Sequence, residues 1–396
     1  MISEEQPRNL EKPMCSAYSI LLFLTFLISG ALPPPAWAAQ KDPAQKFPKN
    51  PLTETVTFLS RNLTIDRIYK SMQGPSDSQS VTLTNDNPPE LLWITSYRVE
   101  VMEPDGQTPA LQEFMCHNNL DFNSGQHSQM MGWSHLATGR MFTLSQGQFS
   151  IDLPEGFGIP VMSNENFSLS NQVLNHNIKN INTQVRNKVT FDFIRDKNLV
   201  QPLKPLFPTN GFVMALLEGK DGFFGLDQPD EVQKQATCLP GAHAPGIKSA
   251  FFNDQFGRKF SGHWVVKLGK TEQKTLVTKW LRIPYDTTVH FIAVHVHPFC
   301  ESLELRDITT GKTVFKSTMK GPPKGVGLEK VDYLSNTEGI PVYKDHEYEM
   351  ISNYNNTSGV EQDAMATFFL YLYDKEFKNP AFANAATAQT YMSPAR

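Results

Sequence analysis

Short apolar or alternating runs, separated by clusters of Pro, Gly and Asn, dominate the chain after its first 50 residues. A helical repeat of 3.6 residues is hard to find, whereas runs of this length and spacing are typical of β-strands. The clearest runs are Leu91–Ile94, Tyr97–Val101, Gln148–Ile151, Thr190–Phe193, Trp264–Val266, Val289–His297, Ser302–Leu305 and Ala366–Tyr373. The pattern predicts an all-β protein built from antiparallel β-sandwiches of the jelly-roll type.

A proline-rich stretch at residues 202–208 interrupts this pattern near the middle of the chain. Three prolines in seven residues are difficult to place inside a sheet, because proline has no N–H for the ladder. We therefore expect two consecutive sandwiches, at 56–205 and 206–377. A polar arm at 39–55 and an Ala-rich tail at 378–396 flank them. The length of 396 residues agrees with two domains.

The N-terminus resembles a leader for export. A nearly unbroken apolar run covers Ala17–Leu32, Arg8 and Lys12 precede it, and Ala36-Trp37-Ala38 follows it as a cleavage pattern. We predict a signal peptide at 1–38 and a secreted or periplasmic protein. An uncleaved anchor is the alternative, because the segment before the run is long and acidic. The run is shorter than the roughly 20 residues of a membrane span, and no span is expected after leader removal.

Composition and charge limit the classes of partner that the protein is expected to bind. Hydrophobic residues make up 40% and aromatic residues 11% of the chain, enough for packed cores. The net charge is −4 and the sequence has no run of Lys or Arg, which disfavours nucleic acid as a ligand. A small molecule is the expected partner, and no oligomeric state is predicted.

Four cysteines occur, of which Cys15 lies in the leader and Cys116, Cys238 and Cys300 remain. An odd number in an oxidising compartment predicts one disulfide bond and one thiol, or a thiol that binds something. The sequence leaves the pairing open.

The run that ends in His295-Val296-His297 carries the strongest chemical signal. Residues i and i+2 of a strand point to the same face, so the two imidazoles lie side by side as ligands of one metal must. Burying two imidazoles is costly unless they are bonded. The pair alone predicts zinc as readily as copper, and two ordinary histidines are the alternative.

Met365 opens the aromatic strand that ends at Tyr373. A methionine in such a place usually fills a core. If its thioether instead joins two imidazoles, the soft sulfur favours copper(I) over zinc.

The sequence resembles the copper type II, ascorbate-dependent monooxygenases in two motifs. The first is His295-Val296-His297, and the second is Asp363-Ala364-Met365 followed by a Tyr-rich strand, with Met365 68 positions after His297. The family comprises the peptidylglycine α-hydroxylating and dopamine β-monooxygenase-like enzymes. The resemblance implies that His295, His297 and Met365 hold an oxygen-activating copper. It also implies a second copper, for electron transfer, in the N-terminal half.

Shorter stretches extend the resemblance over roughly 110–374. Met115–Leu120 is similar to the segment where the family has a His-His pair, and His176 falls at its third histidine. One histidine of the pair is replaced here, by Cys116 or Asn118. The implied second site is therefore His117, His176 and the Cys116 sulfur, unless Cys116 is in a disulfide bond.

The family's clamp for a substrate carboxylate is missing, since Ala293 and Phe369 stand at its Arg and Tyr positions. We therefore expect an apolar or aromatic substrate rather than a peptide with a free carboxylate. The predicted function is a copper monooxygenase that uses O2 and an external reductant such as ascorbate, with one or two coppers. The alternatives are a non-catalytic copper-binding or copper-delivery protein and a metal-free sandwich. His127, His135, His243, His263, His290 and His346 are not expected to be ligands.

Overall fold

The computed structural model describes residues 52–69, 73–131, 139–216, 251–253 and 256–380. The predicted signal peptide, most of the arm and most of the tail lie outside these residues, as do His135, Cys238 and His243. The described chain is all-β with multiple sheets, as the hydrophobic pattern predicts. Its helices are short: α1 (Ser124–Met131), α3 (Thr278–Leu281) and the 3₁₀ turns η2 (Gln112–Phe114) and η3 (Asp196–Asn198).

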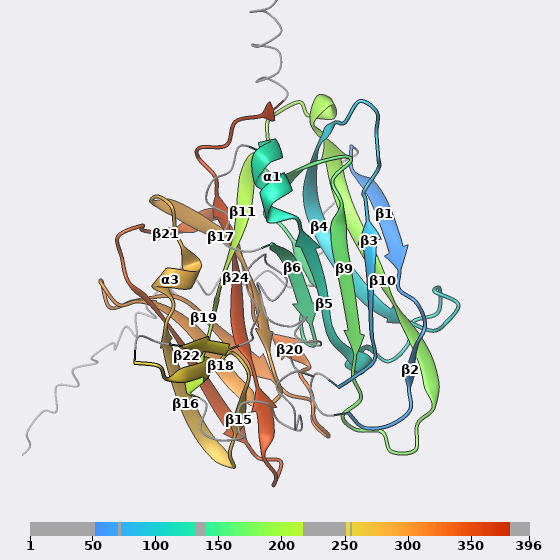
Figure 1. Ribbon diagram of the computed structural model, residues 1–396, viewed down its shortest axis with the longest axis vertical. Coiled ribbons are helices and arrows are strands. Elements are labelled where there is room, and N and C mark those ends of the chain that lie inside the picture. The colour runs from blue at the N-terminus through green and yellow to red at the C-terminus, as the bar shows by residue number, and fades with distance from the viewer. Residues whose placement is uncertain (1–51, 70–72, 132–138, 217–250, 254–255, 381–396) are drawn as a thin grey trace, which may run out of the picture. The chain divides into compact units, whose positions relative to one another are not determined.

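Within the described residues, one ten-stranded sheet runs from the N-terminal to the C-terminal half (Figure 1). Its order is β1 (Glu54–Leu59), β10 (Thr183–Arg195), β4 (Leu91–Met102), β8 (Phe157–Met162), β11 (Lys204–Phe212), β24 (Ala366–Tyr373), β17 (Thr287–Val296) and β21 (Leu334–Val342), with β2 (Leu63–Ile65) on β10 and β7 (Ser150–Asp152) on β4. All its pairs are antiparallel except β8 with β11.

Further sheets complete the two halves. The N-terminal one has the order β3 (Ser76–Val81), β9 (Phe167–Val173), β5 (Met115–Phe122) and β6 (Arg140–Ser145). The C-terminal one has the order β16 (Gly269–Leu276), β22 (Tyr348–Asn356), β18 (Cys300–Asp307), β19 (Lys312–Lys320) and β20 (Lys330–Val331). Two small sheets are β12 (Ala215–Leu216) with β14 (Lys259–Ser261) and β13 (Phe251–Asn253), and β15 (Trp264–Val266) with β23 (Gln362–Ala364).

Strands β17 and β24 are buried on both faces, which explains their continuous apolar runs. Phe291 and Tyr371 belong to the core of the N-terminal half, whereas Ile292 and Leu370 belong to the core of the C-terminal half. The two strands therefore separate two hydrophobic cores. A histidine on either face of β17 is enclosed by protein, and this placement creates the site described below.

The expectation that the prolines at 202–208 break the sheet is wrong. Pro205 and Pro208 lie inside β11, and the predicted boundary between 205 and 206 falls within that strand. β11 pairs with β24 over seven positions but with β8 only at Lys204 and Pro205. Most of β11 thus has a ladder on one side alone, where proline is tolerated as it is on an edge strand.

Cys116 and Cys300 are not joined to each other. Cys300 is buried and its thiol donates to the Ser302 carbonyl oxygen at 3.5 Å, and burial raises the pKa of this thiol. Any disulfide bond that involves Cys238 lies outside the described residues.

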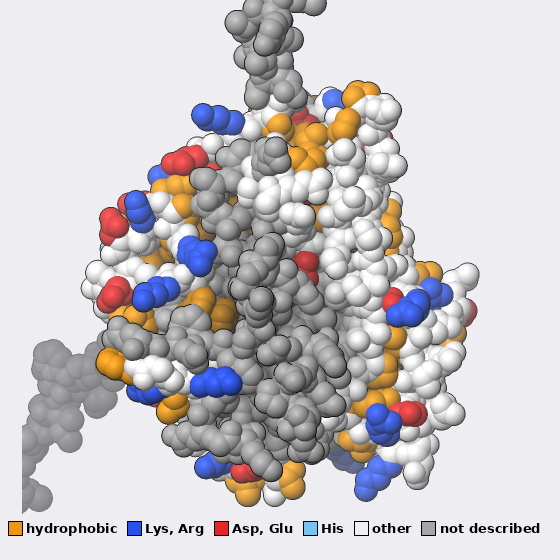
Figure 2. Space-filling view, viewed as in Figure 1, with side chains coloured by type: hydrophobic (Ala, Val, Ile, Leu, Met, Phe, Trp, Pro, Cys, Tyr) orange, Lys and Arg blue, Asp and Glu red, His pale blue; other side chains and the backbone are white. Residues whose placement is uncertain are grey.

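No helix among the described residues is long and apolar enough to cross a membrane. On the face drawn in Figure 2, acidic and basic side chains are interspersed rather than gathered by sign. This agrees with the absence of a basic run from the sequence.

Candidate metal centre

His295 lies near the end of β17 and His297 directly after it, and both side chains are buried, with 3% and 6% exposure. Because side chains alternate between the two faces of a strand, the two imidazoles lie on the same face, as the sequence predicts. Their ring centroids are 5.5 Å apart. The end of the strand is fixed by a hydrogen bond of 3.2 Å from the His297 N–H to the Met365 carbonyl oxygen.

Met365 stands between β23 and β24 and is fully buried. The register pairs Val296 with Ala366, so the next pair is His297 with Met365. Opposed residues of an antiparallel pair project to the same face, so a continued register would put the Met365 side chain on the face of the two imidazoles. The Tyr354 hydroxyl donates to the same Met365 carbonyl at 2.7 Å and accepts from the His297 N–H at 3.3 Å.

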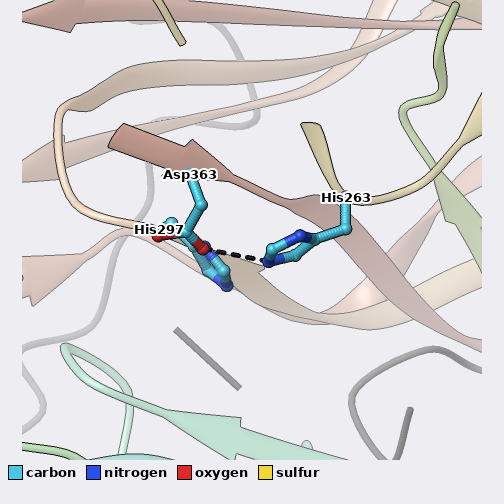
Figure 3. A group of neighbouring side chains, drawn as sticks. All are labelled: His263, His297 and Asp363. Carbon is cyan, nitrogen blue, oxygen red and sulfur yellow. Dashed lines mark ion pairs between the residues drawn. The ribbon is translucent and has the colours of Figure 1, made fainter. Parts of the chain in front are cut away.

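His263 and Asp363, which the sequence did not indicate as ligands, join this group. Oδ2 of Asp363 lies 2.6 Å from Nδ1 of His297 and 2.9 Å from Nε2 of His263. Figure 3 shows both imidazoles directed at the same carboxylate. Pairing of β15 with β23, with Val265 opposite Asp363, brings the two segments together. The ligand atoms of the three buried residues lie within 4.8 Å of one another.

The N-terminal half contributes His117 from β5, buried to 1% exposure, with its ring centroid 6.3 Å from that of His295. Cys116 precedes it at an irregularity of the strand, and its sulfur lies 3.3 Å from Nδ1 of His117. His176 follows β9, and burial lowers the pKa of its imidazole. His117 of the predicted N-terminal site therefore lies beside His295 of the predicted C-terminal site.

Burial determines the charge of this cluster. It lowers the pKa of His117 to about 3, helped by the positive charges of Arg140 and His297. Burial, and then the neighbouring His297 and His117, hold the pKa of His295 well below its usual value. Burial alone raises the pKa of Asp363, but His297 and the hydrogen bond from His263 outweigh it and the pKa falls well below 3.8. His117 and His295 are thus neutral imidazoles and Asp363 is a carboxylate, the forms that bind metals.

Both ring nitrogens of His295 are buried, and among the described residues neither has a hydrogen-bond partner. Leaving a buried polar group unpaired costs about 1–3 kcal/mol, so such an imidazole calls for a ligand. Two imidazoles bound to one ion have centroids roughly 5 to 6 Å apart, because each nitrogen lies about 2 Å from the metal. The His263–His297 spacing is 5.3 Å, and His295–His297 and His117–His295 are 5.5 and 6.3 Å. The cluster fits a metal ion.

Other histidines are engaged elsewhere. Nδ1 of His127 lies 2.6 Å from Glu165, and His290 contacts the Thr288 hydroxyl and the Asn336 carbonyl oxygen. His346 pairs with Asp307 at 2.7 Å and is half-buried. None of the three belongs to the cluster.

Ala293 and Phe369, at the positions of the family's substrate clamp, are opposed on β17 and β24 and packed in the core of the N-terminal half. They line no described cavity, and the core accounts for their apolar character. The expectation of an aromatic substrate gains no support from them.

The signals for His263 and Asp363 were present but weak. Asp363 stands two residues before Met365 in the stretch that carries the family resemblance, and His263 lies between a glycine and a tryptophan. Only the pairing of β15 with β23 brings these two residues together, and a sequence does not show which short strands pair.

No protein-family model matches the chain, that of the copper monooxygenases included, and no curated protein matches it. Among solved structures, PNGase F, a glycosylasparaginase from Flavobacterium meningosepticum, is 9% identical with a TM-score of 0.34, over 82% of this chain and 98% of that chain. The STIV MCP is 11% identical with a TM-score of 0.23, over 84% of this chain and 98% of that chain. Similarities this low indicate nothing about activity.

Proposed function

We propose that the protein is an exported, copper-dependent oxidoreductase, a monooxygenase that hydroxylates a C–H bond of a small molecule with O2 and an external reductant such as ascorbate. The observation that carries the proposal is His295, a buried imidazole whose two nitrogens have no partner among the described residues. Beside it is the imidazole of His297, whose backbone N–H donates to the carbonyl oxygen of the thioether-bearing Met365. That donor set favours copper(I) over zinc.

Copper bound by these residues would supply oxygen activation and one-electron transfer. The chain itself orients the ligand residues and excludes water from them. Tyr354 ties the backbones of His297 and Met365 together through its hydroxyl, and Asp363 holds Nδ1 of His297. Outer contacts of this kind fix the orientation of a ligand imidazole. The core on either side of β17 excludes water from the imidazoles.

His117 and Cys116 support storage of a second electron nearby, since the His117 and His295 rings are 6.3 Å apart. The family resemblance adds His176 as a further candidate ligand. An imidazole–thiol pair stabilises copper(I), the reduced form that must be present before O2 reacts.

The test is metal content and reductant-driven O2 uptake of the purified full-length protein, compared with His295→Gln and with His346→Gln as the matched control. We expect copper binding and ascorbate-dependent O2 consumption in the wild type and the control, and loss of both in His295→Gln. Zinc bound in preference to copper, or turnover unaffected by His295→Gln, would contradict the proposal.

One observation favours a second function, non-catalytic copper binding or delivery. The imidazoles of His117, His263, His295 and His297 are all buried to 6% exposure or less, so an organic substrate has little access to them. This function predicts tight copper binding without O2 uptake under any reductant. The same experiment distinguishes it from the monooxygenase.

A further inference from the structure

We propose that His263, Asp363 and Nδ1 of His297 form a second metal position beside the one at His295, so that the cluster binds a pair of transition-metal ions. The inference rests on the proposed function in taking His295, His297 and Met365 as the first position. It adds His263 and Asp363 as ligands.

The contacts of Asp363 carry the inference. Its Oδ2 approaches Nδ1 of His297 to 2.6 Å and Nε2 of His263 to 2.9 Å, and all three side chains are buried. Two imidazoles and a carboxylate whose ligand atoms lie within 4.8 Å of one another are a common donor set for zinc and copper. Ligand atoms around a tetrahedral ion with bonds of roughly 2 Å lie roughly 3.3 Å apart, so the two contacts of Asp363 would lengthen slightly around an ion.

His297 is common to both positions. Its ring centroid lies 5.3 Å from that of His263 and 5.5 Å from that of His295. Both spacings are those of imidazoles that share one ion. Nδ1 of His297 faces Asp363. Bound to both ions, the ring would bridge them as an imidazolate, one nitrogen to each ion, and would release its N–H proton to solvent.

The number of metal-ligand side chains in the cluster also favours two ions. His117, His263, His295, His297 and Asp363 all lie at this cluster. A tetrahedral ion takes four ligands, so these donors exceed what one ion uses. The imidazole rings follow one another in the order His263, His297, His295 and His117. One ion fits between His263 and His297, and the other between His297 and His295.

The alternative role of Asp363 is to accept hydrogen bonds from His297 and His263 and orient them, with no ion of its own. Copper stoichiometry separates the two roles. Full-length protein is stripped with a chelator and titrated with Cu(II) alone. Bound copper is counted and compared with the integrated electron paramagnetic resonance intensity. The variants are His263→Gln, Asp363→Asn and His295→Gln, with His346→Gln as the control, and each is checked for a cooperative thermal transition.

We expect two coppers per chain in the wild type and His346→Gln, and one in His263→Gln and Asp363→Asn. Two Cu(II) ions joined through one imidazole couple their spins, so the integrated intensity should fall below the copper content in the wild type and match it in His263→Gln. If Asp363→Asn does not fold, His263→Gln decides alone.

One copper in the wild type that His263→Gln retains and His295→Gln loses overturns the second position and leaves the proposed function standing. One copper that His263→Gln loses and His295→Gln retains supports the site at Asp363 and removes the proposed catalytic position. Two coppers that His263→Gln and Asp363→Asn both retain would place the second ion elsewhere, at His117 and Cys116, and overturn the inference whatever His295→Gln binds.

Discussion

The Asp363 carboxylate lies 2.6 Å from Nδ1 of His297, and both side chains are buried. The contact joins residues 66 positions apart in the sequence, one directly after β17 and one in β23. The second contact of the same oxygen, with His263, makes this carboxylate the common partner of two imidazoles.

Replacing Asp363 with alanine should destabilise the metal-free protein by roughly 3–5 kcal/mol, because it leaves two buried imidazoles without their acidic partner. The measurement is denaturant unfolding in the presence of a chelator. Asp307→Ala is the control, since Asp307 pairs with only one imidazole, the half-buried His346, and should cost less. Equal losses in the two variants would show that Asp363 has no special part in the cluster.

Tyr354→Phe should lower stability by about 1–3 kcal/mol and also weaken copper binding. The hydroxyl contacts the backbones of Met365 and His297, so its removal takes one of two donors from the buried Met365 carbonyl oxygen and loosens both predicted ligands. Tyr371→Phe is a matched control: its buried hydroxyl donates to the Met141 carbonyl oxygen at 2.9 Å. The control should lose similar stability and keep its copper affinity. Identical copper affinity in both variants would refute the role of Tyr354.

Met365→Leu should leave the fold intact, with a loss below about 1.5 kcal/mol, because the substitution nearly conserves volume in a buried place. Copper(I) affinity, measured by competition with a copper(I) chelator, should fall at least about tenfold, which is about 1.4 kcal/mol. Zinc affinity should change little, because zinc has no preference for a thioether. An unchanged copper(I) affinity would mean that Met365 is core filling alone.

Arg195 joins three carboxylates, with contacts of 2.7 Å to Glu54, 2.7 Å to Asp86 and 2.8 Å to Glu90. Hydrogen bonds from Thr84 and then Arg195 lower the pKa of Asp86, and those from Lys197 and then Arg195 lower the pKa of Glu90. Carboxyl groups with a lower pKa in the folded state stabilise it above their unfolded pKa values of 3.8 and 4.5. That stabilisation is lost as the pH falls through the folded values.

Arg195→Gln should therefore reduce stability by at most about 1 kcal/mol at pH 7, since the carboxylates are partly exposed. The difference from the wild type should shrink as the pH falls below about 4. Denaturant unfolding at pH 7 and pH 3 measures it, with the exposed Lys312→Gln as control. A difference that grows toward low pH has the wrong sign and would rule out this network as the cause.

The sequence by itself determined the all-β class and the shared face of His295 and His297. Alternation, apolar runs and turn residues act over a few positions, and the period of two in a strand follows from backbone geometry alone. The register that pairs Val296 with Ala366 brings the backbone of Met365 to the end of the His-x-His pair. That register depends on packing between strands, and the family resemblance was the only sequence signal for it.

Only the tertiary structure decided which distant strands meet. It put Pro205 and Pro208 inside β11, because that strand has a ladder on one side over most of its length. In the folded chain the His117 ring lies near the His295 ring. The pairing of β15 with β23 places His263 in contact with Asp363. Such contacts depend on long-range pairing and burial. The hydrophobic effect that drives them is proportional to the buried apolar area and has no direction. The pattern of apolar residues along the sequence therefore does not show which strand packs against which.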